Sequence, residues 1–266
     1  MQEGTNLMLD FDFKCSVQTQ LDRLWLTPDD LAHALGVRPA SVRTWLDPAV
    51  PDRLPAKEAF DWLSKQADAI GEIIFRRFDE ALAERRRWGQ SIVRCYREPD
   101  LAPGRLLGLE NLASSLVADR LEDEGEDVAV VFACRDDAYI DSHLDSWPDI
   151  DPKAAWVASM DSLGVTTLDV MNALGISART LKDWRDPAAT RSVPFAEAYD
   201  YLDTYAEALE GRTRQLIEAA PDPMPYHPVS RSGKLTQQQR IDNRAALAAA
   251  DALMRDGSTV IDFAYV

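Results

Sequence analysis

The residues with the clearest chemical potential are basic and hydroxyl side chains on two short predicted helices, one starting near Pro39 and one near Ala178. A helix in the DNA major groove presents its outward, N-terminal side chains to base edges, and guanine offers two acceptors to arginine or lysine. We predict that Val42 and Trp45 face inward at a spacing of i, i+3. The outward residues, as candidates for base contacts, are then Pro39, Ala40, Arg43, Thr44, Ala178, Arg179, Lys182 and Asp183.

Arg43, Arg179 and Lys182 are the candidates for guanine contacts, and a solvated surface charge is the alternative interpretation of each. Side chains near the same helices could hold phosphate oxygens. These candidates are Arg38, Ser41, Arg53, Thr180, Arg185 and Arg191. The formal charge is +2 over residues 38–57 and +1 over residues 177–197. These values weakly favour DNA, because affinity for a duplex depends on neutralising its phosphates.

The net charge of the whole chain, −16, argues against a nucleic-acid partner at first sight. Its distribution weakens that argument, because residues 119–151 hold twelve acids and two bases, a net of −10. The rest of the chain therefore carries only −6. Overall charge is a poor guide to the partner of this protein.

The elements that must position the candidate residues are short helices joined by a glycine turn. Thr27 is a good N-cap, Pro28 suits the first helical position, and Gly36 can adopt the left-handed conformation that ends a helix. The next helix runs from Pro39 to about Leu46 and stops at Asp47-Pro48. This pattern predicts a helix-turn-helix, with a purely structural pair of helices as the alternative.

The same pattern recurs further along the chain. Residues 26–37 match residues 165–176 at an offset of 139, and the match continues through the tryptophans and prolines that follow. Later in the chain the offset becomes 132, with Glu110-Asn111 matching Asp242-Asn243. We therefore predict an N-terminal extension (1–15), a first repeat (16–134), an acidic linker (135–153) and a second repeat (154–266).

Each repeat is predicted to continue with a long helix and a small strand–helix–strand tail. In the first repeat these elements are expected over 56–86, 91–96, 109–122 and 128–133, and in the second over 195–217, 224–227, 236–255 and 260–265. Gly125 and Val128 match Gly257 and Val260 in this part. Residues 7–13 alternate between apolar and acidic side chains, which predicts an added strand. The predicted fold is mainly α with small β elements, in two tandem helix-turn-helix units related by a pseudo-twofold axis.

With these features the chain resembles small bacterial and phage regulators of the anti-CRISPR-associated type and the YdiL-like proteins. The resemblance rests on Trp45, Pro55, Arg94-Cys95-Tyr96 and Val128 to Ala133, and in the second copy on Trp184, Pro194, Pro225-Tyr226 and Val260 to Tyr265. It implies a repressor whose tail forms a homodimer on an inverted-repeat operator. The tandem copies depart from the family pattern, and they imply a monomeric pseudo-dimer, with a homodimer as the alternative.

Other chemistries find little support in the sequence. Three scattered cysteines and three scattered histidines form no metal-ligand pattern, and no glycine-rich phosphate loop or catalytic triad is recognisable. We therefore expect no enzymatic activity, no metal and no cofactor. The chain also shows no secretory signal and no apolar stretch of membrane-spanning length, which predicts a cytoplasmic protein without a membrane partner.

Two questions stay open at this level. The second basic stretch, with arginines at 76–77, 85–87, 94 and 97, could bind nucleic acid, but interspersed acids favour a salt-bridged helix. The protein as a whole is predicted to be a DNA-binding transcriptional regulator that recognises double-stranded DNA. The alternative is a protein-interaction module on the same scaffold, such as an acidic decoy or an inhibitor of a nucleic-acid enzyme.

Overall fold

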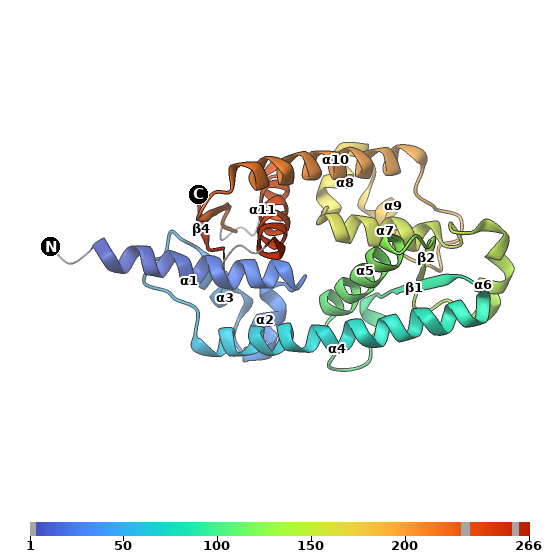
Figure 1. The fold of residues 1–266 in the computed structure, drawn as a ribbon, viewed down its shortest axis with the longest axis horizontal. Helices are drawn as coiled ribbons and strands as arrows, with labels where there is room; N and C mark the ends of the chain where they lie inside the picture. The colour runs from blue at the N-terminus through green and yellow to red at the C-terminus, as the bar shows by residue number, and fades with distance from the viewer. Residues whose placement is uncertain (1–3, 230–234, 257–260) are drawn as a thin grey trace. The chain divides into compact units, whose positions relative to one another are not determined.

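The structure is a computed structural model that describes residues 4–229, 235–256 and 261–266. The chain is mainly α-helical (Figure 1), and its described strands are short and pair into two separate two-stranded parallel sheets. This confirms the predicted class, mainly α with small β elements.

One order of elements occurs twice along the chain (Figure 1). The first run is α1 (Gly4–Arg23), α2 (Pro28–Leu35), α3 (Pro39–Leu46), α4 (Lys57–Trp88), β1 (Ser91–Cys95), α5 (Leu107–Asp123) and β2 (Val128–Phe132). The second run is α7 (Pro152–Leu163), α8 (Thr167–Leu174), α9 (Ala178–Trp184), α10 (Ala196–Ala219), β3 (Met224–Tyr226), α11 (Gln237–Arg255) and β4 (Phe263–Tyr265). Helix α6 (Asp137–His143) and 3-10 turns at Glu98–Asp100 and Leu144–Ser146 complete the elements.

The first helix of each pair is delimited by the residues that the sequence indicated. Thr27 caps α2 by accepting a hydrogen bond from the Asp30 amide at 3.2 Å, and the Asp30 carboxylate accepts from the Thr27 amide at 2.8 Å. Thr166 caps α8 through the same reciprocal arrangement. Gly36 and Gly175 end the two helices with φ of +64°, a conformation that costs other residues about 1–2 kcal/mol.

Contacts divide the chain into two compact units, and neither unit corresponds to a sequence repeat. Unit 1 consists of Met1–Ala67 and Tyr205–Val266, and unit 2 is Asp68–Thr204. The boundaries fall inside α4 and α10, so each unit combines the short helices of one repeat with the strands of the other. The predicted ranges 16–134 and 154–266 therefore describe the repeat in sequence but not the packing.

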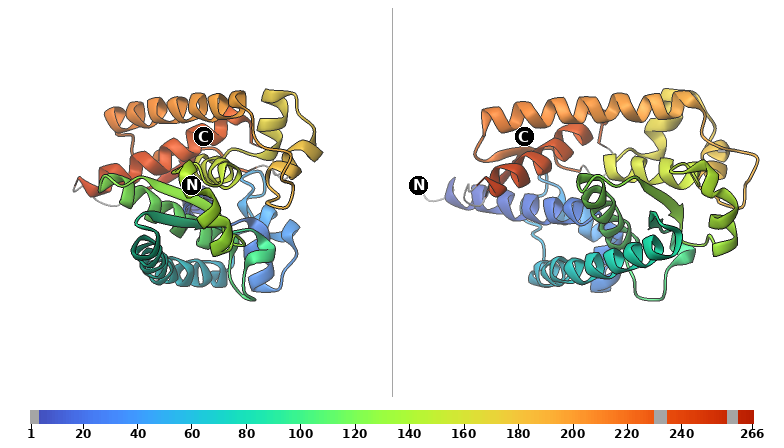
Figure 2. Two further views of the ribbon diagram at one scale, coloured as in Figure 1. Left: turned by 90° about the vertical axis from the view of Figure 1, so that its right-hand side faces the viewer. Right: turned by 45° about the vertical axis from the view of Figure 1, so that its right-hand side comes forward.

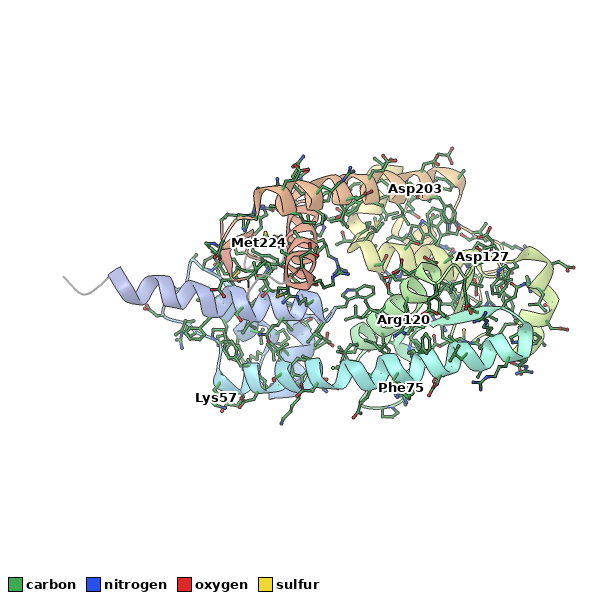
Figure 3. All side chains as sticks on the ribbon, in the orientation of Figure 1. Lys57, Phe75, Arg120, Asp127, Asp203 and Met224 are labelled. Carbon is green, nitrogen blue, oxygen red and sulfur yellow. The ribbon has the colours of Figure 1, made fainter. Side chains whose placement is uncertain are left out.

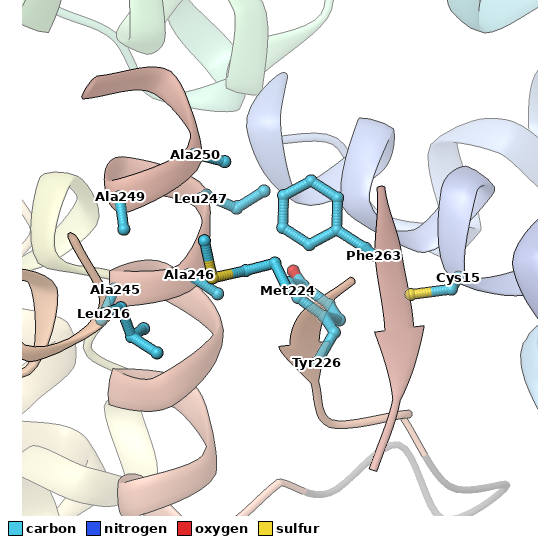
Figure 4. Close-up of a cluster of buried hydrophobic side chains, with 10 residues drawn as sticks. All are labelled: Cys15, Leu216, Met224, Tyr226, Ala245, Ala246, Leu247, Ala249, Ala250 and Phe263. Carbon is cyan, nitrogen blue, oxygen red and sulfur yellow. The ribbon is translucent and has the colours of Figure 1, made fainter. Parts of the chain in front are cut away.

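The core of unit 1 joins α1 to the tail of the second repeat. Cys15 of α1 lies in one buried cluster with Met224, Tyr226 and Phe263 of β3 and β4 and with the alanine-rich face of α11 (Figure 4). The buried Gln18 side chain donates to the His227 carbonyl at 3.2 Å and accepts from the Val229 amide at 3.1 Å. Figure 2 shows the red C-terminal segment beside the blue α1. Helix α1 of the first repeat thus packs on the tail of the second repeat instead of its own.

Unit 2 is built around the sheet of β1 and β2. The register runs from Ser91 beside Val128 to Cys95 beside Phe132. Side chains bond to one main-chain position at each outer edge of this sheet, where a further strand could otherwise pair. The Asn111 amide of α5 brackets the Tyr96 main chain, with hydrogen bonds of 2.8 and 3.1 Å, and Asp151 accepts from the Phe132 amide at 3.4 Å.

Side chains also fill the space between α4 and α5 within unit 2 (Figure 3). Val93, Val117 and Leu121 form a buried cluster with Ala81 of α4. At the rim of this cluster the Arg120 guanidinium lies 5.0 Å from the centre of the Phe78 ring. The second half of α4 is therefore anchored to the tail of its own repeat, whereas its first half belongs to unit 1.

Two sequence predictions need correction here. Residues 7–13 belong to helix α1, so the predicted N-terminal strand is wrong. Their alternation covers only seven residues and runs directly into Val17, Leu21 and Leu24, which are buried at helical spacing. The acidic segment 135–153 is not a plain linker, because it contains α6 and buries Ile140 and Ile150. Gly257 and Val260 lie outside the described residues, and β4 covers only Phe263–Tyr265 of the strand predicted there.

Asp22 of α1 allows a test of this packing by pH. Its carboxylate accepts a hydrogen bond from the Tyr226 hydroxyl, and burial raises its pKa above the usual 3.8. The charged form is therefore disfavoured in the folded state, so its contribution to stability falls as pH rises above the unfolded pKa. We expect Asp22→Asn to gain stability relative to the unchanged protein as the pH rises above about 4, the ordinary pKa of an aspartate. Urea unfolding across this range measures the difference, and a difference that shrinks with rising pH would contradict the assignment.

Candidate nucleic-acid interface

Helix α3 is anchored by a stripe that differs by one position from the sequence prediction. Val42 and Leu46 are 0% and 1% exposed, whereas Trp45 is only half-buried. The prediction that Trp45 packs inward is therefore wrong in degree. At the equivalent place in α9, Trp184 is buried with its ring 5.3 Å from that of Trp156. The first repeat has Val17 at the position of Trp156, so Trp45 lacks this aromatic partner.

The outward side of α3 carries the predicted base-contact candidates. Pro39 and Ala40 are exposed, and Arg43 and Thr44 are half-buried. The Arg43 guanidinium forms an ion pair of 2.7 Å with Asp29 in the first turn of α2. Thr44 directs its hydroxyl to the Ala40 carbonyl at 2.8 Å. Because an exposed ion pair contributes only about 0–1 kcal/mol, DNA could displace Asp29 from Arg43.

Helix α9 presents a more open basic surface. Ala178, Arg179 and Lys182 are exposed, and Asp183 is half-buried beside them. Within the described part of the chain, neither Arg179 nor Lys182 forms an ion pair. Ser177 caps the helix by accepting from the Thr180 amide at 3.1 Å. Both cations lie on the outward side of the helix, Arg179 in its first turn and Lys182 in its last. Arg179 therefore has the N-terminal place that a base-reading helix uses, and Lys182 lies one turn further along.

The candidates for phosphate contacts include residues without an ion pair and residues that already have a side-chain partner. Arg38, Arg53 and Arg191 are exposed, and none of them forms an ion pair in the ranges that the structure describes. Ser41 and Thr180 are half-buried, and Thr180 lies 2.9 Å from the Ser177 hydroxyl. Arg185 instead faces Asp161 at 3.7 Å. This ion pair is longer than that of Arg43 with Asp29, so Arg185 stays a phosphate candidate that has an acidic neighbour.

The predicted residues thus fall into two separate groups. Those numbered 38–53 lie in unit 1, and those numbered 178–191 lie in unit 2. Each group surrounds one short helix and the loop that follows it. Each unit by itself therefore presents one candidate reading helix with basic residues at its ends.

Sequence reasoning missed a buried lysine behind each of these helices. The Lys14 amine donates to the carbonyls of Asp47, Val50 and Arg53 at 3.0, 2.9 and 2.7 Å. The Lys153 amine donates to the carbonyls of Asp186 and Ala189 at 2.7 and 2.8 Å. The two lysines are separated by the same 139 residues as the repeat. Extending the alignment backward from Leu26 would have found them.

The second basic stretch is a salt-bridged surface, as the favoured interpretation predicted. Its arginines mostly have acidic partners: Arg76 and Arg77 pair with Glu110, Arg85 with Glu126, Arg87 with Asp137, Arg94 with Glu84, and Arg97 with Asp100. A cavity of about 260 Å³ lies among these side chains, and its charged lining is formed by the same pairs. The stretch therefore has few charges left for a phosphate backbone.

The described residues contain no cluster of histidine, cysteine, aspartate and glutamate that could hold a metal ion. Burial raises the pKa of the Cys95 thiol above its usual range, which keeps this side chain in the unreactive thiol form. Among the helices that the structure describes, none has the length and apolar character needed to cross a membrane. Comparisons with protein families, with curated proteins and with solved structures found no match for this chain.

Proposed function

We propose that this protein is a sequence-specific regulator of transcription that binds double-stranded DNA, most simply as a repressor. The observation that carries the proposal is the contrast between two sets of cations. Most arginines of the tail in unit 2 form ion pairs with carboxylates. In contrast, five basic residues near α3 and α9 are exposed and form no ion pair within the described residues: Arg38, Arg53, Arg179, Lys182 and Arg191. Free cations around a short helix suit phosphate and guanine contacts.

The two helix-turn-helix units would act as the two halves of a dimer on one chain. Their outward residues differ: α3 offers Pro39, Ala40 and Arg43, whereas α9 offers Arg179, Lys182 and Asp183. The preferred target is therefore an imperfect inverted repeat with unlike half-sites. The resemblance to anti-CRISPR-associated regulators agrees with this proposal and stays a prediction, as do the pseudo-twofold relation and the monomeric state.

Selection from a pool of random duplexes at low salt tests the proposal. We expect enrichment of one imperfect inverted repeat, followed by a retarded band with that sequence in a gel shift. The double variant Arg179→Ala/Lys182→Ala should weaken binding by at least about thirtyfold, because each good guanine contact contributes about 1–3 kcal/mol and two are removed. It should also relax the preference for bases in one half-site only.

The matched control removes two exposed positive charges elsewhere. Lys65→Ala/Arg86→Ala takes both from α4, outside the proposed interface. This control should retain the half-site preference and lose affinity only slightly. Failure to enrich any sequence would refute the regulator, and a perfect palindrome would refute the unlike half-sites. Equal losses in both double variants would indicate non-specific attraction alone.

One observation favours the alternative of a protein-interaction module. Leu168, Val193 and Phe195, around the helix pair of the second repeat, are 53%, 51% and 40% exposed. Apolar side chains on a surface can mark a protein contact. The same gel shift separates the two functions, because an interaction module retards no duplex at any salt concentration.

A further inference from the structure

The same interaction occurs at both proposed reading helices. In each repeat a buried lysine amine donates hydrogen bonds to carbonyls of the loop that follows the helix. In the first repeat the loop is residues 47–56, between α3 and α4, and in the second it is residues 185–195, between α9 and α10. Lys14 and Lys153 are 1% and 3% exposed. A lysine so deeply buried is rare unless its amine is fully used.

The two loops also agree in their own hydrogen bonds. The Asp47 carboxylate accepts from the Ala49 amide at 2.9 Å, and the Asp186 carboxylate accepts from the Ala188 amide at 3.0 Å. The amide three residues after Asp47 bonds back to its carbonyl at 3.1 Å, and the same bond of 3.1 Å follows Asp186. One further turn follows in each loop, where the Arg53 amide bonds to the Val50 carbonyl at 3.1 Å and the Ser192 amide to the Ala189 carbonyl at 3.3 Å. The lysine amine binds the carbonyls at which these successive turns meet, Val50 in the first loop and Ala189 in the second, and so holds the turns together.

The lysine acts at the end of the helix as well as on the loop. Asp47 is the C-cap of α3, and the negative end of a helix dipole lies at this terminus, so a buried cation is favourable there. Lys14 reaches onward to the carbonyl of Arg53 itself, and the Arg53 side chain is exposed. Arg191 stands two residues after Ala189, the last carbonyl that Lys153 binds. Lys14 therefore fixes the backbone of Arg53 directly, and Lys153 fixes the turn that leads to Arg191.

We propose that Lys14 and Lys153 are positioning residues for DNA binding, each setting the loop that brings its own repeat's arginine to a phosphate. The inference rests on the proposed DNA-binding function. Lys14 positions Arg53 and Lys153 positions Arg191, and neither lysine affects the arginine of the other repeat. Removal of a lysine then acts through one arginine and leaves the contact of the other repeat intact.

Double-mutant cycles on the full chain test this assignment. Lys14→Met and Arg53→Ala should each weaken binding to the selected duplex roughly tenfold and reduce the salt slope by about one unit. The double variant should lose no more than either single variant. Lys14→Met combined with Arg191→Ala should instead multiply the two losses, because these residues belong to different repeats.

The reciprocal cycle with Lys153→Met keeps the proposal testable if Lys14→Met does not fold, as judged by its circular dichroism. Lys65→Met, an exposed lysine on α4, is the matched control and should bind as the unchanged protein does. Independent losses within one repeat would overturn the assignment while the function stands. Absence of binding by the unchanged protein would overturn the proposed function and, with it, this role for the lysines.

Discussion

When the chain is cut between Asp145 and Ser146, the two fragments should stay associated. Both residues are exposed and lie in the segment between the repeats, where a protease recognition sequence can be inserted. Each compact unit contains chain from both sides of this cut: unit 1 takes α1–α3 from one side and β3, α11 and β4 from the other. We expect the two fragments to elute together in size-exclusion chromatography at micromolar concentration and to separate only in denaturant.

The expectation follows from what is buried across the cut. In unit 1, Cys15 packs against Met224 and Tyr226, and full burial of one large apolar side chain contributes about 1.5–3 kcal/mol. In unit 2, the Asp151 carboxylate binds both the Phe132 amide and, at 2.8 Å, Arg135. The uncut protein with the inserted sequence is the control. If each repeat folded on itself, the fragments would separate on the column, and the exchanged packing would be refuted.

Glu110→Leu should destabilise unit 2, by at most about 3–5 kcal/mol, because it removes one of the two acidic partners of the buried Arg77. The Glu110 side chain is 2% exposed and pairs with Arg77, which is 3% exposed, and with Arg76 at 2.9 Å. Arg77 also lies 4.0 Å from the centre of the Tyr96 ring and keeps a second acidic partner in Glu80, whose side chain is 43% exposed. Chemical denaturation measures the loss of unfolding free energy.

A second substitution distinguishes a stranded charge from lost packing. Arg77→Met in the Glu110→Leu background should recover most of the loss, because an apolar pair can replace a buried ion pair at little cost. Asp242→Leu at the matching position of the second repeat should cost less, because Asp242 is 18% exposed and its partner Arg212 is 36% exposed. Equal losses at Glu110 and Asp242, or no recovery by Arg77→Met, would show that the charge is not the cause.

The sequence predicted the local structure well, because local signals determine it. The helix ends are set by backbone geometry and capping at Thr27, Pro28, Gly36 and Pro39. These local effects can be predicted without knowledge of the rest of the chain. The strand predicted over residues 7–13 failed because seven residues cannot distinguish two periods when a longer helix follows. The predicted burial of Trp45 was wrong because the repeat matches residue types only. Burial depends also on the neighbouring side chains, and the first repeat lacks the neighbours that cover Trp184.

The exchange of tails between repeats was beyond sequence reasoning. Two nearly equivalent tails present similar apolar faces to either pair of short helices, and the pattern in a single sequence does not say which pairing forms. The specific contacts that distinguish the pairings, such as Gln18 with His227, link residues 209 positions apart. The candidate DNA-contacting residues, in contrast, were largely foreseen as exposed, because outward positions on a short helix follow from its period alone.

The division into units also has a consequence for the order in which the chain can fold during synthesis. Unit 2 is one uninterrupted stretch, whereas unit 1 needs residues from both before and after it. A ribosome therefore releases everything that unit 2 requires before residues 205–266 exist, and domains generally fold as soon as they can. Helix α1 can already pack on α3 through the bonds of Lys14, but Cys15 must wait for its partners in β3, β4 and α11 throughout that time. The face of α1 around Cys15 is thus among the first parts made and the last to be buried, which leaves it open to chaperones and to aggregation during synthesis.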